Sequence, residues 1–206
     1  MQQQPPKGFI DWKQNVEKMY FYQKSKVIYD MTFHFTKCYM NKFKDRTVDQ
    51  MVQAARCGKQ NFVEGFIDGL MSTDIKLRLI TIGRGSLHEL KEDYEDYLRT
   101  RNLTIWTEGH PRYAQMVEYC KYRNNLEDYE PYYERWNDEE IANICLTLFH
   151  MTDRLVLGYL RKLEQDFLQN GGIKETMYKI RTEYRDWKKH QNFYYNYKNS
   201  LKNNQQ

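Results

Sequence analysis

Apolar residues recur at intervals of three or four over several long stretches of the chain, a spacing typical of amphipathic α-helices. Only ten glycines and four prolines interrupt the 206 residues, which favours long helices over many short strands. The predicted long helices cover residues 11–43, a segment that begins near Val48, residues 73–99, residues 137–168 and residues 173–197. Residues 101–136 contain Pro111 and Pro131 and are predicted to form a long connection with one short helix near 112–123. The predicted fold class is all-α.

Local signals place the starts of two of these helices. Asn137 and Glu140 form an N-x-x-E capping box, in which each side chain bonds the backbone amide of the other residue. The helix near position 48 has two alternative starts, a capping box made by Thr47 and Gln50 or an N-cap at Asp49.

The helix over 73–99 carries a stripe that is predicted to face the interior: Ile75, Leu79, Ile82, Ser86, Leu90, Tyr94 and Tyr97 or Leu98. Part of this stretch, LRLITIGRGSL, can also be read as a strand that enters a phosphate-binding glycine turn. A dinucleotide fingerprint needs a third glycine where this chain has His88. Ser86 also lacks the flanking glycines of a nucleophile elbow, so the helical interpretation is favoured.

Charge is distributed unevenly along the chain, whose net charge is +4. Residues 1–44 carry eight lysines against three acidic residues, and residues 171–206 carry eight basic residues against three acidic ones. Each end is therefore +5, and the middle, residues 45–170, is −6. With 40% apolar and 29% charged residues, the composition is that of a folded chain.

Other signals bound location and chemistry. There is no secretion signal and no apolar stretch of about 18 residues, so we expect a cytoplasmic protein without a membrane partner. Cys38, Cys57, Cys120 and Cys145 form no C-x-x-C pair and are predicted to be reduced thiols. No histidine follows a glutamate at the spacing that di-iron bundles need. We expect no metal, no cofactor, no small-molecule substrate and no enzymatic activity.

Two stretches, residues 45–65 and 85–90, combine small residues with an amide and carboxylates at helical spacing. They look like the contact seam of two antiparallel helices rather than a catalytic centre. The candidate helix-packing or interface residues are Gly58, Asn61, Glu64, Gly65, Gly85, Ser86 and Glu89.

Asn61 and Glu64 lie three residues apart, nearly on one face of their helix. If both are buried, each needs a polar partner, and Arg78 or Arg84 on the next helix can supply one. We expect a polar clamp that fixes the register of the two helices. A polar pocket or a subunit contact is the alternative.

The basic ends suggest a second class of function, because Lys and Arg neutralise phosphates and nearby aromatic residues can stack on bases. The simpler alternative places these lysines and arginines on the solvated faces of amphipathic helices. The candidate nucleic-acid-binding residues are Lys13, Lys18, Lys24, Lys26, Arg181, Arg185, Lys188 and Lys189.

Several motifs resemble one known family. They are Ile-Tyr-Asp at 28–30, DRTVDQMVQAARCGKQNFVEG at 45–65, GSLHEL at 85–90 and DYEDYL at 93–98. Over roughly residues 20–170 the chain resembles the bacterial four-helix-bundle proteins related to those encoded by ribosomal-RNA intervening sequences, in particular the four helix bundle suffix domain proteins.

This resemblance implies an up-and-down four-helix bundle that assembles as a ring-like homo-oligomer, a pentamer in several relatives, without enzymatic activity. A related branch, the accessory proteins of diversity-generating retroelements, has a basic surface and is associated with nucleic acid and a reverse transcriptase. The acidic middle of this chain departs from that branch.

The expected organisation has four parts. Residues 1–10 are a flexible N-terminus, 11–170 the four-helix bundle with a long connection before its fourth helix, 171–197 an extra basic amphipathic C-terminal helix that starts after two glycines, and 198–206 a disordered tail. The expected function is homo-oligomeric assembly and partner binding, and the alternative is binding of RNA or single-stranded nucleic acid by the basic ends.

Overall fold

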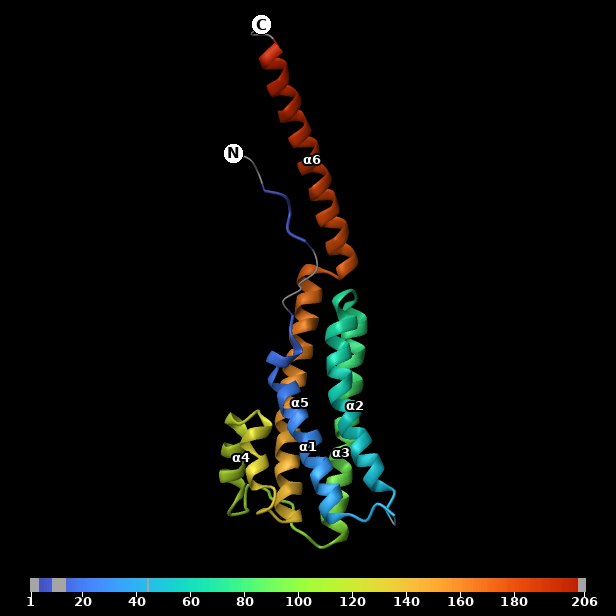
Figure 1. Cartoon of the computed structure of the whole chain (residues 1–206), viewed down its shortest axis with the longest axis vertical. Coiled ribbons are helices and arrows are strands. Elements are labelled where there is room, and N and C mark those ends of the chain that lie inside the picture. The colour runs from blue at the N-terminus through green and yellow to red at the C-terminus, as the bar shows by residue number, and fades with distance from the viewer. Residues whose placement is uncertain (1–3, 9–13, 44, 204–206) are drawn as a thin grey trace.

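The part of the chain that the structure describes is built from helices joined by loops, without a β-strand. A computed structural model describes residues 4–8, 14–43 and 45–203 (Figure 1). Its α-helices are α1 (Tyr20–Tyr39), α2 (Thr47–Ile67), α3 (Thr73–Thr100), α4 (Tyr113–Tyr122), α5 (Asp138–Asn170) and α6 (Ile173–Asn203). Short 3-10 turns are η1 (Val16–Lys18), η2 (Asp68–Leu70), η3 (Leu126–Asp128) and η4 (Glu130–Tyr132). The all-α prediction is confirmed.

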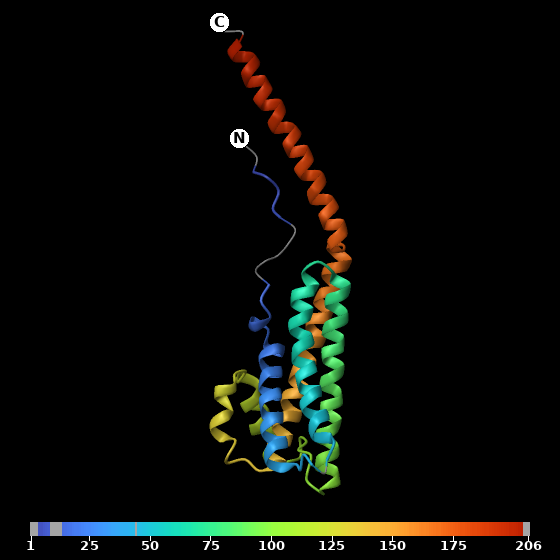
Figure 2. The same ribbon diagram turned by 45° about the vertical axis from the view of Figure 1, so that its right-hand side comes forward.

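Four helices, α1, α2, α3 and α5, lie side by side, and we call them the core helices. α2 packs on α1 and α3, and α5 packs on the same two helices. Figure 1 and Figure 2 show that successive core helices run in opposite directions. Each of them contributes fully buried side chains to one apolar core, among them Phe35, Met51, Phe62, Leu90, Tyr94 and Ile141.

Side-chain hydrogen bonds decide where two of the core helices begin. At α5, Asn137 Oδ1 accepts the Glu140 amide and Glu140 Oε2 accepts the Asn137 amide, both at 2.9 Å, so the predicted capping box is confirmed. α2 begins at Thr47, close to the predicted start near Val48, but neither predicted cap is present. The carboxylate of Asp45 accepts the Thr47 amide at 3.0 Å instead. An aspartate just before the first turn satisfies one of the free amides there.

The first long helix is shorter than the predicted 11–43. Asn15 Oδ1 accepts the amide of Glu17 at 2.8 Å and starts the separate turn η1. Extended backbone at Met19 and Met40 then bounds α1 at its two ends. Predicted helical positions 11–13 lie outside the described residues, as do 1–3, 9, 10 and 44.

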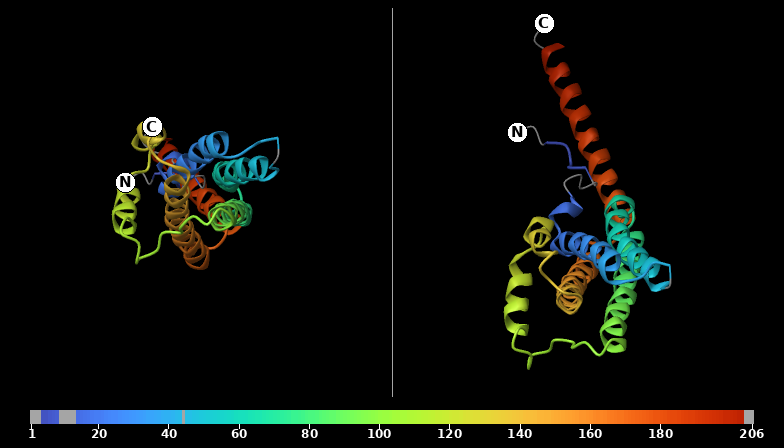
Figure 3. Two further views of the ribbon diagram at one scale, coloured as in Figure 1. Left: turned by 90° about the horizontal axis from the view of Figure 1, so that it is seen from below. Right: turned by 60° about the horizontal axis from the view of Figure 1, so that its bottom comes forward.

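The connection between α3 and α5 is itself folded. It contains α4, which confirms the short helix predicted near 112–123, followed by η3 and η4. α4 packs on α5 and η3 contacts α1, so the connection covers the side of α5 that faces away from α2 (Figure 3).

After α5 the backbone turns at Gly171, whose φ of 76° is a left-handed conformation that glycine adopts without strain. α6 then extends away from the core helices (Figure 2). It continues to Asn203, past the predicted end at 197, because no proline or glycine interrupts it there. The predicted disordered tail is therefore helical at 198–203, and 204–206 lie outside the described residues.

α2 and α3 approach most closely at two glycines. A methyl group on Gly58 would lie 2.7 Å from the Leu87 side chain, and one on Gly83 would lie 2.9 Å from the Gly58 carbonyl oxygen. A methyl group on Gly65 would lie 3.0 Å from the Ile80 side chain. Gly58 and Gly65 thus pack against α3 as the sequence predicts.

The packing role predicted for Gly85 is wrong, because a methyl group there would meet nothing within 4 Å. Two residues correspond to about 200° around a helix, so Gly85 faces away when Gly83 faces α2. The same rotation exposes Ile75 and Ile82, which were expected inside, and buries Ile80 and Leu87.

We expect Gly83→Ala to lower the free energy of unfolding by about 1–3 kcal/mol, because the added methyl group overpacks the contact with Gly58. Gly85→Ala is the matched control and should be neutral or stabilising by up to about 1 kcal/mol, since alanine is the better helix former. Urea unfolding of both variants measures the difference. Equal stabilities would contradict the close approach.

Candidate functional site

The polar residues predicted on the α2 side of the seam do not form a clamp. Asn61 Nδ2 donates to the Cys57 carbonyl of its own helix at 2.9 Å. Glu64 is half-buried and has no hydrogen bond or ion pair within the described chain. Arg84, one of its predicted partners, instead pairs with Asp153 on α5, because the rotation of α3 directs this side chain to the other side.

Ser86 and Glu89 lie on the outer edge of the same seam. They line a shallow pocket of about 680 Å³ together with Gln53 and Cys57 of α2. Glu89 is exposed and Ser86 half-buried. The structure therefore brings Ser86 and Glu89 together on a surface and places Glu64 outside this pocket.

Glu89 belongs to an acidic group near the end of α3. Partial burial first, and then the charges of Asp96, Glu89, Glu92 and Asp45, raise the pKa of Asp93 to about 6. The group concentrates like charges on one surface of the acidic middle of the chain. Such a surface repels phosphates.

A second polar cluster, missed in the sequence, joins α3 to α5. Arg84 donates to both carboxylate oxygens of Asp153, at 2.6 and 3.3 Å, and His88 Nε2 lies 3.0 Å from Asp153 Oδ1. Burial alone raises the pKa of Asp153, but the bonds from Arg84 and His88 outweigh it and lower the pKa below its usual value. Because both oxygens are engaged, the carboxylate acts as a tie between helices.

This cluster borders a groove of about 680 Å³ between α5 and the connection. Asn143 holds the connection in place, since its Oδ1 accepts the Trp106 amide at 2.7 Å and its Nδ2 donates to the Thr104 carbonyl at 2.9 Å. His150 also lines the groove, and burial together with the charge of Lys91 lowers its pKa. No nucleophile with an adjacent base is assembled in this groove.

An aromatic pocket of about 330 Å³ lies on the other side of the connection. Tyr132 and Trp136 stack with ring centroids 5.4 Å apart, and Tyr119 stands edge-on to both. Arg112 pairs with Glu140 at its rim. The stacked rings of Tyr132 and Trp136 therefore form part of the wall of this pocket, between α4 and the start of α5.

Lys24 was predicted to bind phosphates, and the structure contradicts this. Its side chain lies inside the protein, 3% exposed. Lys24 Nζ donates to the carbonyls of Cys120 and Arg123, at 2.6 and 3.0 Å, at the C-terminal end of α4. Burial lowers the pKa of Lys24. A cation here donates to carbonyls that have no partner within the helix. Its positive charge also interacts favourably with the negative end of the helix dipole.

The other basic candidates near the N-terminus form no continuous surface. Lys26 pairs with Glu17 at 3.1 Å, Lys18 is exposed, and Lys13 lies outside the described residues. On α6, in contrast, all four predicted basic residues are exposed: Arg181, Arg185, Lys188 and Lys189. Lys189 lies 3.6 Å from Asp186, a contact that solvent screens.

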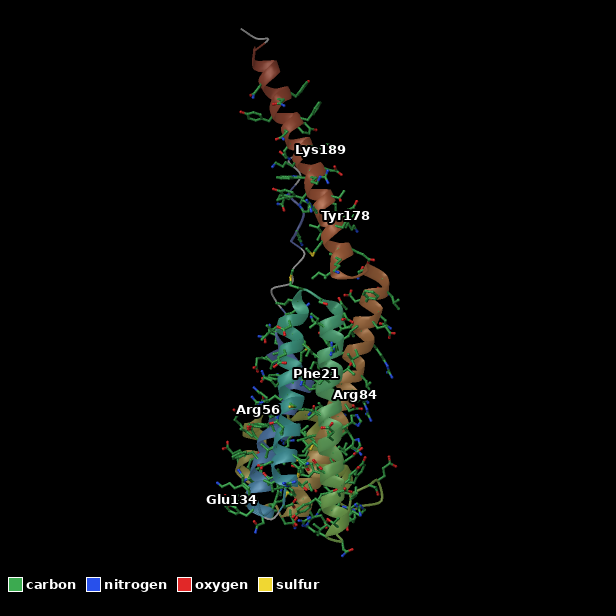
Figure 4. All side chains as sticks on the ribbon, turned by 90° about the vertical axis from the view of Figure 1, so that its right-hand side faces the viewer. Phe21, Arg56, Arg84, Glu134, Tyr178 and Lys189 are labelled. Atoms are coloured by element: carbon green, nitrogen blue, oxygen red, sulfur yellow. The ribbon has the colours of Figure 1, made fainter. Side chains whose placement is uncertain are left out.

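The apolar stripe of α6 has no cover from the core helices, none of which packs extensively against it. Tyr184 is 47% exposed and its ring lies 5.6 Å from that of Trp187. In Figure 4 the labelled side chains of Tyr178 and Lys189 stand clear of the rest of the protein. Gln4 and Pro6 of the N-terminal segment line a hollow beside Trp187.

Two kinds of feature are absent from the described residues. No group of three or more His, Cys, Asp or Glu side chains is gathered as a metal site would need. No helix in residues 4–8, 14–43 and 45–203 is both long and apolar enough to cross a membrane.

Comparison with known proteins gives no match: no family model, no curated protein and no solved structure is significantly similar to this chain. The family resemblance stays a prediction from the motifs at 45–65 and 85–90.

We expect Lys24→Met to lower the free energy of unfolding by about 1–3 kcal/mol, because it leaves the Cys120 and Arg123 carbonyls without their donor. Lys18→Met, which changes an exposed lysine, is the control and should leave stability unchanged. Urea unfolding measures both variants. A Lys24→Met protein as stable as the parent would contradict the cap.

Asp93 gives a pH-dependent prediction. Below its ordinary pKa of 3.8 the carboxyl is protonated in both folded and unfolded protein, so Asp93→Asn should have no effect there. Above pH 6 the folded protein carries an unfavourable charge that asparagine removes. We expect Asp93→Asn to raise the melting temperature by about 2–4 °C at pH 7.5, after allowance for solvent screening, and by nothing at pH 3.5.

The control for this prediction is Glu118→Gln, at an exposed position on α4. It should shift the melting temperature equally at both pH values. A gain from Asp93→Asn that persists unchanged at pH 3.5 would contradict the electrostatic explanation.

Proposed function

We propose that this chain is a non-enzymatic helical-bundle protein that acts through homo-oligomeric assembly and partner binding. The observation that carries the proposal is α6, a 31-residue helix with an apolar stripe that its own core helices leave uncovered. A helix that keeps Tyr184 and Met177 partly exposed gains free energy when another surface covers them.

The arrangement of the core helices supports assignment to the up-and-down four-helix bundles that the motifs resemble. Four helices with alternating directions are what that resemblance implies, and the long connection before the last one agrees with the prediction from the sequence of residues 101–136. Because these helices already bury a common core within one chain, the surfaces available for assembly are the ones that remain exposed. The ring-like homo-oligomers of the family make assembly the first property to test.

A second candidate function is binding of RNA or single-stranded nucleic acid by α6. The observation that favours it is the exposure of Arg181, Arg185, Lys188 and Lys189 on one free helix. The burial of Lys24 and the acidic group around Asp93 weigh against a wider basic surface.

Native mass, measured before and after nuclease treatment, separates the two functions. Assembly predicts a nuclease-resistant multiple of the 25.3 kDa chain mass. Nucleic-acid binding predicts a mass that falls on nuclease treatment, and binding of labelled RNA that weakens steeply with salt. A monomer free of nucleic acid would contradict both.

A double variant sharpens this test. Arg185→Glu with Lys189→Glu reverses two exposed charges on α6. It should abolish binding to RNA if the second function holds, and should leave the mass of a protein-only assembly unchanged.

A further inference from the structure

The apolar stripe of α6 follows a heptad repeat. Successive positions on it are separated alternately by four and three residues, which is the spacing of the a and d positions of a left-handed coiled coil. In this assignment the a positions are Met177, Tyr184 and Gln191, and the d positions are Ile173, Ile180, Trp187 and Tyr194. The repeat is sustained over about three heptads.

The seam formed by these residues is narrow, and the core helices do not cover it. At the adjoining e and g positions Lys174, Arg181, Lys188 and Glu183 are charged, so the flanks of the seam are polar up to Lys188. Further along, Tyr195 and Tyr197 occupy an e and a g position. A stripe of this width suits a partner helix better than a broad protein surface. α6 is about 46 Å long at 1.5 Å per residue. Most of the stability of helices in proteins comes from packing of an amphipathic face, so a helix partner that covers the seam would stabilise α6.

The flanking charges select a second copy in parallel orientation. In an antiparallel pair e positions face e positions, which opposes Lys174, Arg181 and Lys188 to one another. In a parallel pair each g position faces the e position five residues further on in the other helix, which brings Glu183 next to Lys188 of the second copy. The parallel arrangement removes the repulsion and adds an attraction at both sides of the seam.

We infer that α6 pairs with α6 of a second copy of this chain as a parallel, in-register, two-stranded coiled coil. The inference rests on the proposed assembly and names the surface that carries it. Gln191 at an a position meets its own counterpart, and a polar pair there fixes register. The N-terminal segment is the competing occupant, since Gln4 and Pro6 line the hollow beside Trp187.

The seam is tested with two matched substitutions in the full chain. Tyr184→Asp places a charge at an a position and should raise the Kd of self-association by about 100-fold. Tyr178→Asp makes the same chemical change at a b position that is 76% exposed, and should leave the Kd within about twofold. Sedimentation equilibrium measures both, and circular dichroism checks that each variant keeps its helix content.

Orientation is tested by cross-linking. Gln191→Cys, in a chain that also carries Cys38→Ser and Cys57→Ser, should form an intermolecular disulfide under mild oxidation, because only a parallel in-register pair brings position 191 next to itself. Cys120 and Cys145 are buried and should not form intermolecular disulfides under these conditions. Asn192→Cys in the same background is the control off the seam and should not cross-link efficiently.

The outcomes separate the inference from the proposed function. A dimer that Tyr184→Asp dissociates and Gln191→Cys cross-links supports both. If Tyr184→Asp leaves an oligomer intact, the proposed assembly stands but the pairing through α6 is contradicted. If a dimer forms and Gln191→Cys does not cross-link it, the parallel orientation is contradicted. A monomer overturns both, and conversion of that monomer to a dimer on deletion of residues 1–8 would identify the N-terminal segment as the occupant.

Discussion

The close approach of α2 and α3 at Gly58 and Gly83 sets the rotation of α3, and much of the remaining structure depends on that rotation. With Gly83 against α2, Leu87 enters the core and Arg84 is directed to α5, where it binds Asp153 at 2.6 Å. The same rotation leaves Ser86 and Glu89 at the surface. One contact between two residues without side chains therefore decides which polar groups of α3 tie helices together and which face solvent.

The connection before α5 depends on a different kind of contact. A surface lysine gains little from one ion pair, but Lys24 is buried, and its ammonium satisfies two carbonyls at the end of α4. Asn143 holds the other end of the connection through the backbone at Thr104 and Trp106. Two buried polar side chains thus anchor a segment that also contributes apolar side chains, Trp106, Met116 and Tyr129 among them, to the core. A count of basic residues along the chain overstates the basic surface by including Lys24.

Helix positions and most helix ends could be predicted because their causes are local. The capping box at Asn137 and the turn at Gly171 act within a few residues, and the stripe of α2 leaves one face to bury. The buried face of α3 could be predicted only in its second half, where Leu90, Tyr94 and Leu98 are buried as expected. In its first half Gly83 and Gly85 are equivalent until a partner helix is present. The tie between Arg84 and Asp153 joins residues 69 positions apart, so no local pattern contains it. The apolar repeat of α6 is a local pattern that the sequence contains. That no core helix packs against it becomes evident only in the structure.

Folding and assembly are separable in this molecule. The core helices close around Phe35, Phe62 and Tyr94, so their burial requires no second chain. The large apolar side chains that stay exposed include Ile67 and Met71, at the end of the core helices from which α6 departs, and the aromatic residues of α6 itself. A parallel pairing of α6 places these ends of two copies on the same side, where the exposed residues of both can be covered in one interface. Antiparallel pairing would hold the two ends apart and leave them in water. The charge pattern of α6 and the distribution of exposed apolar residues therefore favour the same assembly for independent reasons.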